Sequence, residues 1–201
     1  MEYLVGKRAL ALDQPALVER LRGRTRVLVD VGTGDGRFVR AAALADPAAF
    51  AIGLDACREQ LWQAVRAAPP NALYVIANAL ALPCELDGRA THLTLNFPWG
   101  SLLAGLLAGD PALLARLAAI ACPGATLDVR LNAGALAEAG ATLAEGGAAV
   151  RAALVAAGFA LRRPVALGPA ELRACPTTWA HRLAFGRDPR ALWLRGRRLN
   201  G

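Results

Sequence analysis

One stretch near the N-terminus, residues 26–36, constrains the fold of this chain more than any other. It reads Arg-Val-Leu-Val-Asp-Val-Gly-Thr-Gly-Asp-Gly, so a run of β-branched and Leu side chains leads directly into three glycines at alternate positions. We expect a buried β-strand followed by a turn, because glycine accepts positive φ and lets a ligand approach the backbone closely. Residues 37–46 are predicted to form a helix after it. A strand, a glycine turn and a helix in this order are typical of a nucleotide-type cofactor site at the carboxyl edge of an open α/β sheet.

The spacing of the glycines indicates the kind of cofactor. A dinucleotide-binding turn has the pattern Gly-x-Gly-x-x-Gly, but here Gly36 comes one residue early and Arg37 occupies its place. The run Asp-x-Gly-x-Gly-x-Gly is instead typical of S-adenosylmethionine (SAM) methyltransferases. SAM has no pyrophosphate for the turn to hold, but it has an ammonium group that the carboxylate of Asp30 would bind. A left-handed turn without a ligand is the alternative interpretation.

Length and composition are those of one globular domain, which we assign to residues 1–201. The chain is 55% hydrophobic and 19% charged, enough to bury a core. It has no uninterrupted apolar run of membrane-spanning length and no signal-peptide pattern, so we expect a cytoplasmic location without a membrane partner. The four Cys residues are far apart and the two His residues lack ligand spacing, so we predict no metal site and no disulfide framework.

Hydrophobic periodicity and turn residues predict strands that alternate with helices. We expect a mostly parallel sheet with helices on both faces and an antiparallel hairpin at the end of the chain. An N-terminal arm or hairpin (residues 1–12) precedes this sheet, and a target-recognition loop (residues 168–190) precedes its last strand. Beyond the first strand, turn and helix, the predicted strands are residues 50–54, 73–77, 91–95, 125–131, 159–167 and 191–195. The main predicted helices are 13–21, 58–68, 102–121, which Gly105, Gly109 and Pro111 interrupt, and 146–157, with one or two helical turns at 169–175.

Two further segments would meet a cofactor at this sheet edge. Asp55 ends the second predicted strand and lies 23 residues beyond Gly32, close to the spacing at which an acid binds ribose hydroxyls. A surface Asp at a strand end is the alternative. The loop of residues 78–80 follows the third predicted strand and is expected to reach the adenine end of the cofactor.

Residues 96–101, Asn-Phe-Pro-Trp-Gly-Ser, follow the fourth predicted strand and therefore lie at the same edge. A polar residue, a proline and an aromatic residue are the pattern of methyltransferases that act on amino groups of nucleic acids. The proline would stiffen the loop, so that Asn96 meets the target base and Trp99 stacks on it, a contact worth about 1–3 kcal/mol. A Trp that simply joins the core after a strand is the alternative.

Trp179 is difficult to assign to the core, because it lies in a polar segment that also contains Arg182 and Arg187. Two tryptophans from separate loops would hold a base that has been flipped out of its helix, while the arginines hold the backbone phosphates. The distribution of charge supports a nucleic acid partner. Residues 151–201 carry ten Arg and two acids, a net charge of +8, whereas the rest of the chain carries −1. A genome that favours Arg codons is the alternative explanation.

Together these segments resemble the aminoglycoside-resistance 16S rRNA methyltransferases that modify N1 of adenine 1408. Many methyltransferases share the glycine run, but Pro-Trp-Gly-Ser-Leu-Leu combined with the tryptophan–arginine segment is specific. The resemblance implies a Rossmann-like, seven-stranded class I fold, SAM as cofactor, and a monomer that acts on 16S rRNA within the 30S subunit. The matching segments span nearly the whole chain: residues 5–8, 30–36, 54–56 and 98–103, and Thr178-Trp179 with Arg182 and Arg187.

The resemblance also assigns residues to roles. The implied cofactor-binding residues are Asp30, Gly32, Gly34, Phe38, Asp55, Ala56, Ala79, Leu80, Pro98, Trp99, Gly100, Ser101, Leu102 and Leu103. The candidate catalytic residues are Trp99, Trp179, Ser101 and Asn96, and the candidate RNA-binding residues are Lys7, Arg8, Arg182 and Arg187. Two features depart from the family pattern: Leu80 replaces an acid that would bond the cofactor adenine, and residues 132–147 form a short segment rich in Ala and Gly.

The implied reaction needs little from the protein beyond positioning. N1 of adenine has an in-plane lone pair and no proton at pH 7, so an in-line methyl transfer requires no general base. Two alternatives remain: a methyltransferase for another RNA base, such as one in tRNA, and a SAM- or RNA-binding protein without activity. A small-molecule methyltransferase is disfavoured by the excess of C-terminal arginines.

Overall fold

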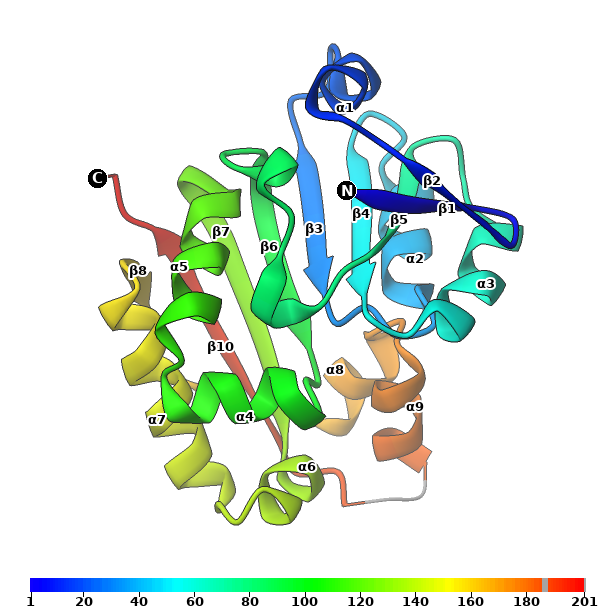
Figure 1. Cartoon of the computed structure of the whole chain (residues 1–201). Helices are drawn as coiled ribbons and strands as arrows, with labels where there is room; N and C mark the ends of the chain where they lie inside the picture. The colour runs from blue at the N-terminus through cyan, green and yellow to red at the C-terminus, as the bar shows by residue number, and fades with distance from the viewer. Residues whose placement is uncertain (186–187, 201) are drawn as a thin grey trace.

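A single sheet with helices on both faces forms the protein (Figure 1). The computed structural model describes residues 1–185 and 188–200. Within them, ten strands form one sheet in the order β2-β1-β5-β4-β3-β6-β7-β10-β8, and β9 also pairs with β10. The strands are β1 (Glu2–Val5), β2 (Arg8–Ala11), β3 (Val27–Val31), β4 (Phe50–Asp55), β5 (Ala72–Ile76), β6 (Ala90–Asn96), β7 (Ala121–Asn132), β8 (Phe159–Leu161), β9 (Val165–Leu167) and β10 (Ala191–Arg198).

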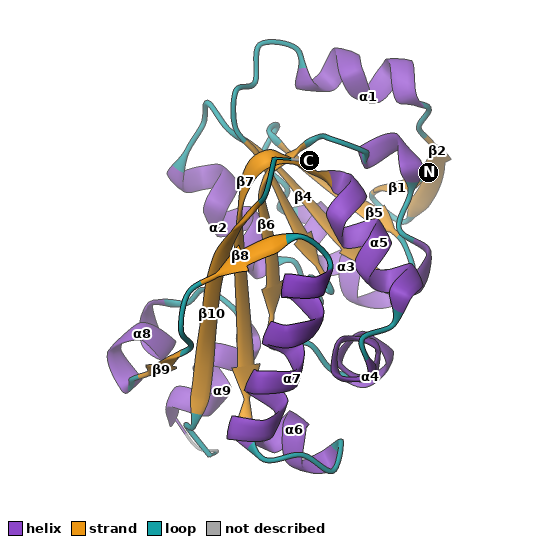
Figure 2. Cartoon of the chain, turned by 90° about the vertical axis from the view of Figure 1, so that its left-hand side faces the viewer, coloured by secondary structure: helices purple, strands orange, loops and turns teal. Residues whose placement is uncertain are grey.

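The helices form two layers. Helices α4, α5 and α7 cover one face of the sheet, and α2, α8 and α9 lie on the other (Figure 2). Side chains of α2 and α3 pack together in a core of their own, which includes Val39, Leu61 and Tyr74. The helices are α1 (Gln14–Leu21), α2 (Arg37–Ala45), α3 (Arg58–Arg66), α4 (Gly100–Ala108), α5 (Pro111–Ile120), α6 (Ala133–Glu138), α7 (Leu143–Ala156), α8 (Pro169–Ala174) and α9 (Thr178–Phe185), with short 3₁₀ turns η1 (Ala79–Ala81) and η2 (Cys84–Leu86).

The predicted fold class is confirmed, and the N-terminal segment is a hairpin that extends the sheet. The seven strands of the class I sheet are present as β5-β4-β3-β6-β7-β10-β8, with parallel pairing from β5 to β7 and antiparallel pairing on both sides of β10. Strands β1 and β2 form a hairpin whose first strand pairs antiparallel with β5. The single strand predicted for residues 159–167 is two strands, because Arg162-Arg163-Pro164 interrupts it and proline has no N–H to donate.

The region predicted as a target-recognition loop, residues 168–190, is largely helical. Its helices α8 and α9 bury Leu172, Ala180 and Leu183 in a small core that also contains Phe97. Helices of six and eight residues are too short to be stable alone, so this tertiary packing is what maintains them. The helical turns predicted for residues 169–175 are confirmed as α8. The loop predicted after them was wrong for residues 178–185, because a core shared with Phe97 stabilises α9.

Local signals set several helix ends. Helix α1 begins after Asp13, close to the start predicted from the sequence. The Asp13 carboxylate accepts a hydrogen bond from the N–H of Ala16. Helix α7 begins earlier than predicted, because Thr142 and Glu145 form a capping box. The interrupted helix predicted for residues 102–121 is two helices, α4 and α5, separated by the left-handed residue Gly109.

No single helix in the described part of the chain is long and apolar enough to cross a membrane. Helices α4 and α5 together have the length and composition of a span, but a bend of 100° separates them. Both bury leucines in the main core.

Candidate active site

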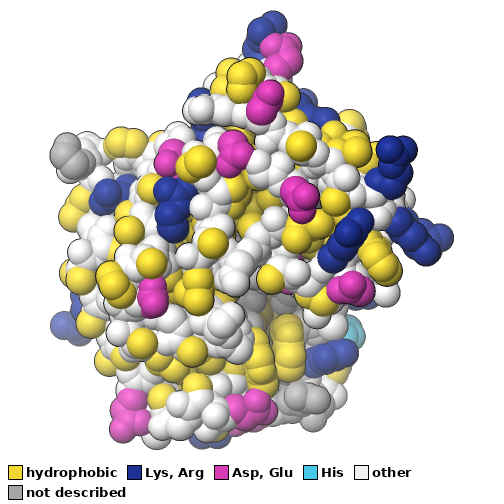
Figure 3. Space-filling view, in the orientation of Figure 1, with side chains coloured by type: hydrophobic (Ala, Val, Ile, Leu, Met, Phe, Trp, Pro, Cys, Tyr) yellow, Lys and Arg dark blue, Asp and Glu magenta, His cyan; other side chains and the backbone are white. Residues whose placement is uncertain are grey.

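A pocket of about 590 Å³ opens at the carboxyl edge of the parallel strands β3, β4 and β6, a volume typical of small-ligand sites. Figure 3 shows the surface hollowed between α4 and α9, with hydrophobic side chains around the opening. The lining comes from the ends of β3, β4 and β6, the glycine turn, α3, the loops after β5 and β6, and the starts of α4 and α9. The residues are Asp30, Val31, Gly32, Thr33, Gly34, Asp35, Leu54, Asp55, Ala56, Gln60, Gln63, Ala77, Asn78, Ala79, Asn96, Phe97, Pro98, Trp99, Ser101, Leu102, Thr177, Thr178, Trp179 and Arg182.

Most of the residues predicted from sequence meet in this pocket. Those that line it are Asp30, Gly32, Gly34, Asp55, Ala56, Ala79, Asn96, Pro98, Trp99, Ser101, Leu102, Trp179 and Arg182. Four predicted cofactor residues are not part of the lining: Phe38, Leu80, Gly100 and Leu103. Leu103 is buried in the main core, and Leu80 points toward Gly105 of α4. Leu80 is 39% exposed and directly follows the lining residue Ala79, so its predicted contact with the cofactor stays a prediction.

The predicted RNA-binding residues are divided in space. Arg182 lines the pocket, whereas Lys7 and Arg8 lie at the turn of the N-terminal hairpin, outside the lining. That turn packs on α3, because the carbonyl of Lys7 accepts a hydrogen bond of 3.0 Å from Arg58 and its ammonium lies 5.7 Å from the ring centroid of Trp62. Arg187 lies outside the described residues.

The glycine turn has the backbone that its sequence requires. Gly32, Gly34 and Gly36 have φ values of 74°, 58° and 69°, which side chains rarely adopt. A Cβ at Gly36 would lie 2.5 Å from atoms of both Ala64 and Tyr74, so this glycine also allows α2 to pack closely. The last glycine of the motif is thus required by packing and does not line the pocket.

Asp55 is bound to the glycine turn through its carboxylate. One oxygen accepts a hydrogen bond of 2.7 Å from the N–H of Gly34, and the other accepts one of 2.8 Å from the N–H of Cys57. These bonds join the ends of β3 and β4. They hold the Asp55 side chain at the pocket wall, where its remaining lone pairs would accept hydroxyl donors.

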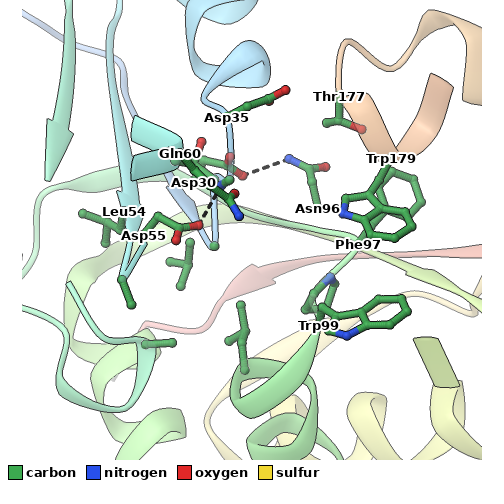
Figure 4. A pocket seen from close by; sticks show the side chains of 18 of the residues that line it. Asp30, Asp35, Leu54, Asp55, Gln60, Asn96, Phe97, Trp99, Thr177 and Trp179 are labelled. Carbon is green, nitrogen blue, oxygen red and sulfur yellow. Dashed lines mark hydrogen bonds between the residues drawn. The ribbon is translucent and has the colours of Figure 1, made fainter. Parts of the chain in front are cut away.

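Asp30 is the one acid in the pocket lining that is almost completely buried, with 1% exposure. Its Oδ1 accepts a hydrogen bond of 2.9 Å from Asn96 (Figure 4) and one of 2.6 Å from Thr94. Its Oδ2 has no hydrogen-bond partner among the described residues. Burial raises the pKa of Asp30 to about 6, and the side chains of Thr94, Thr33 and Asn96 and the charge of Arg130 oppose that rise. A buried carboxylate with one unsatisfied oxygen in a pocket is suited to bind a cationic group.

Trp99 and Trp179 stack on each other at the pocket wall (Figure 4). Their ring centroids are 5.1 Å apart and their planes are inclined by 13°. Phe97 sets the path of the loop that carries Trp99: it is 2% exposed, packs with α8 and α9, and has a left-handed φ of 54°. Such a φ is unfavourable for a bulky residue and persists only where the surroundings enforce it. The loop and α9 therefore share one core, which positions the two indoles.

A second contact joins α9 to the glycine turn. The hydroxyl of Thr178 donates to the carboxylate of Asp35, next to the glycine that lines the pocket. Neither residue was among the site predictions, although both belong to motifs that the sequence showed. The other lining residues that sequence reasoning missed include Thr33, Gln60, Gln63 and Thr177, whereas Asn78 belongs to the loop expected to reach the cofactor. The spacing of Gln60 and Gln63 on one helix face, just after Asp55, was a usable signal.

Residues 1–185 and 188–200 contain no group of three His, Cys, Asp or Glu side chains arranged to hold a metal ion.

Comparisons with known proteins define the family. The sequence model of the family described as 16S rRNA (adenine(1408)-N(1))-methyltransferase, NpmA, matches residues 2–198. The chain belongs to this family. The enzyme class, the fold, the SAM cofactor and the 16S rRNA substrate predicted from the sequence are those of the family, so these predictions are confirmed.

Individual relatives agree along the whole chain. The 16S rRNA (adenine(1408)-N(1))-methyltransferase of Streptoalloteichus hindustanus is 35% identical, and the match covers 94% of each protein. A solved structure of the enzyme so named from Catenulisporales acidiphilia, with cosubstrate SAM, has a TM-score of 0.86 and 25% identity and covers 100% of this chain and 97% of that one. The aminoglycoside resistance methyltransferase NpmB1 has a TM-score of 0.82 and 29% identity, with 98% and 99% covered.

Proposed function

We propose that this protein methylates N1 of adenine 1408 in the decoding site of the 30S subunit, with the adenine flipped out and stacked between Trp99 and Trp179. This methylation would confer aminoglycoside resistance. The observation that carries the proposal is the pair of stacked indoles beside the pocket of the glycine turn. An enzyme that modifies a base at N1 must take the base out of its pair, and two aromatic faces are suited to hold it.

The pocket fits SAM by the chemistry of its donors and acceptors. The free Oδ2 of Asp30 would take the ammonium group, and the carboxylate of Asp55 would accept the ribose hydroxyls. Glycine is required at position 32, since a Cβ there would lie 2.8 Å from Leu102 on the pocket wall. Ala79 would contact the adenine end. SAM supplies an electrophilic methyl group, and the protein supplies the alignment with the attacking nitrogen.

The two indoles must separate to admit a base. A base in contact with both faces requires about 7 Å between the indole planes, which is twice the ~3.5 Å contact distance of stacked carbon atoms. The observed centroid separation is 5.1 Å, so the indoles cover each other in this structure. Insertion of the adenine would replace one indole–indole stack by two indole–adenine stacks. Stacking of two aromatic side chains is worth about 0.5–1.5 kcal/mol, whereas stacking of a base on an aromatic side chain is worth about 1–3 kcal/mol, so the exchange is favourable.

Cationic side chains near the pocket would hold the RNA backbone. Arg182 lines the pocket and lies 5.5 Å from the ring centroid of Trp179, so it would meet the phosphates next to the flipped base. Lys7, Arg8 and Arg187 remain candidates for further rRNA contacts. The net charge of +7 favours association with a polyanion.

Methylation of isolated 30S subunits tests the function directly. Subunits are incubated with protein and labelled SAM, and the modified nucleotide is mapped by primer extension. N1 methylation blocks Watson–Crick pairing, so we expect a new stop at adenine 1408 that requires both protein and SAM. Label at another nucleotide, or in tRNA only, would favour the alternative RNA substrates. SAM binding without any transfer to RNA would favour a protein without activity.

The remaining features of the proposal concern the working form of the enzyme. We propose a monomer that needs no metal of its own and works in the cytoplasm, where its ribosomal substrate lies. Sedimentation at micromolar concentration would give the mass of one 21.0 kDa chain. SAM binding by protein dialysed against a chelator, measured without ribosomes, would be unchanged.

A further inference from the structure

The side chain of Asn96, which the sequence assigned to the target base, is engaged on both sides within the sheet. Its Nδ2 donates to Oδ1 of Asp30 at 2.9 Å, and its Oδ1 accepts from Nη1 of Arg130 at 2.5 Å. The residue is 8% exposed. Both polar groups of the amide are therefore used by the protein, and Asn96 joins Arg130 to Asp30.

Arg130 is held in a definite position. It lies directly opposite Asn96 in the register of β6 and β7, and its guanidinium lies 4.8 Å from the ring centroid of Trp193 and 5.8 Å from that of Phe38. Its carbonyl accepts a hydrogen bond of 2.8 Å from the N–H of Phe97. Arg130 does not line the pocket. Any effect it has on the cofactor must therefore pass through Asn96 or through its charge.

The direction of these hydrogen bonds follows from their chemistry. A guanidinium has only donors, so the oxygen of the Asn96 amide must face Arg130 and its NH₂ must face Asp30. This NH₂ and the Thr94 hydroxyl both donate to Oδ1 of Asp30, which leaves Oδ2 for a ligand. We propose that Arg130 and Asn96 are positioning residues that keep the Asp30 carboxylate ionised and its Oδ2 turned toward the ammonium group of SAM.

The charges around Asp30 agree with this role. Burial is the largest influence on its pKa and raises it, while the positive charge of Arg130 lowers it. Two other titratable groups act electrostatically with Asp30: Tyr74 of β5 and Cys175 after α8. Burial raises the pKa of Tyr74 to about 12 and also raises the pKa of Cys175, so both are neutral at pH 7.

The other acids of the pocket have partners of their own. Asp35, in the glycine turn, accepts from Thr178 and pairs with Arg37 at 3.2 Å. Asp55, at the end of β4, accepts from two backbone N–H groups. Substitution of Arg130 leaves all of these contacts in place. Among the acids of the pocket lining, the electrostatic effect of replacing Arg130 should therefore fall mainly on Asp30.

The test is the pH dependence of SAM binding by the Arg130→Met variant, measured by calorimetry between pH 5.5 and 7.5. In the unmodified protein, SAM binding should weaken as the pH falls through about 6, because Asp30 becomes protonated. In the variant this midpoint should rise. A rise of about one pH unit weakens SAM binding about fivefold at pH 6 and about twofold at pH 7.

A matched ligand separates positioning from a structural effect. 5′-Methylthioadenosine keeps the adenosine and the S-methyl group of SAM, but its sulfur is a neutral thioether and it lacks the amino acid part with the ammonium group. Its affinity should therefore be the same in the variant and the unmodified protein. Asn96→Ala should shift the SAM midpoint in the same direction, and adding it to Arg130→Met should have little further effect. Arg130→Lys keeps the positive charge, so the pH midpoint of its SAM binding should stay close to that of the unmodified protein.

Two results would overturn the proposal. One is an unchanged SAM midpoint in an Arg130→Met variant whose thermal unfolding shows an intact fold. The other is an equal loss of affinity for SAM and for 5′-methylthioadenosine. The proposal rests on the proposed function only for the cofactor, and the assay contains no RNA. A failure to methylate 30S subunits would therefore contradict the proposed function without affecting the result of this binding assay.

Discussion

The indole of Trp99 lies on the indole of Trp179 at a centroid distance of 5.1 Å, although one residue belongs to the loop after β6 and the other to α9. Each ring thus covers the face that we assign to the target adenine. In this contact Trp99 is 38% exposed and Trp179 is partly buried. Without RNA each indole stacks on the other, so the adenine must displace this indole–indole contact to bind between them.

The Trp179→Ala variant should lose methyl transfer while it keeps SAM. Loss of one stacking face, worth about 1–3 kcal/mol, lowers kcat/KM on 30S subunits about 10- to 100-fold. Calorimetry should show nearly unchanged SAM affinity. Trp99→Ala should lose at least as much activity, and Trp179→Phe, which keeps an aromatic face, should retain much of it. Full activity of Trp179→Ala on isolated 30S subunits would show that this stacking is not required.

The Asp30→Asn variant should be more stable than the unmodified protein at pH 7 and should bind SAM poorly. Burial raises the pKa of Asp30 from 3.8 to about 6, so the ionised form costs folding free energy above pH 6 and this cost disappears as the pH falls toward 4. At about 1.4 kcal/mol per pKa unit, the variant gains about 1–3 kcal/mol at pH 7. Urea unfolding of the variant and of the unmodified protein at pH 7 and at pH 4.5 measures the difference in unfolding free energy at each pH. A stability difference that does not depend on pH would contradict this account of Asp30.

Gly36→Ala should destabilise the fold strongly, with Gly88→Ala as the matched control. Both glycines have left-handed φ values, 69° and 65°, so both alanines bear the same backbone strain of about 1–2 kcal/mol. Only at Gly36 would the new Cβ clash, at 2.5 Å from Ala64 and Tyr74, whereas nothing lies within 4 Å of it at Gly88. Overpacking adds about 1–3 kcal/mol, so Gly36→Ala should lower the free energy of unfolding by that much more than the control. Equal losses would mean that α2 shifts freely to accommodate the methyl group.

Arg182→Gln should weaken binding to 30S subunits and reduce its dependence on salt. If Arg182 contacts one phosphate, the slope of log affinity against log salt concentration should fall by about one. Arg22→Gln is the control, because Arg22 is an exposed arginine outside the pocket lining. It follows the last residue of α1, its side chain is 77% exposed, and it pairs with Glu19 of that helix. Filter binding over a range of potassium chloride concentrations measures both slopes. Identical slopes for the two variants would remove Arg182 from the rRNA interface.

Short-range patterns in the sequence determined the elements that line the pocket. The glycine run showed the strand and turn by itself, because positive φ and close backbone approach are local demands that glycine meets. Asp30 and Asp55 were visible because strands of a parallel sheet end at a common edge. Trp99 was visible because it follows a strand and a proline. Each of these signals is contained within about ten residues of the chain.

Contacts between distant segments were decided only by the tertiary structure. The bonds between Asp30, Asn96 and Arg130 cross three strands, and the register of β3, β6 and β7 sets them. The sequence therefore assigned the Asn96 amide to the target base, whereas the structure uses it to join two strands. The helical form of residues 178–185 likewise depends on a core shared with Phe97. Local patterns report what the backbone prefers, but side-chain partners depend on which strands become neighbours, and that is a property of the whole fold.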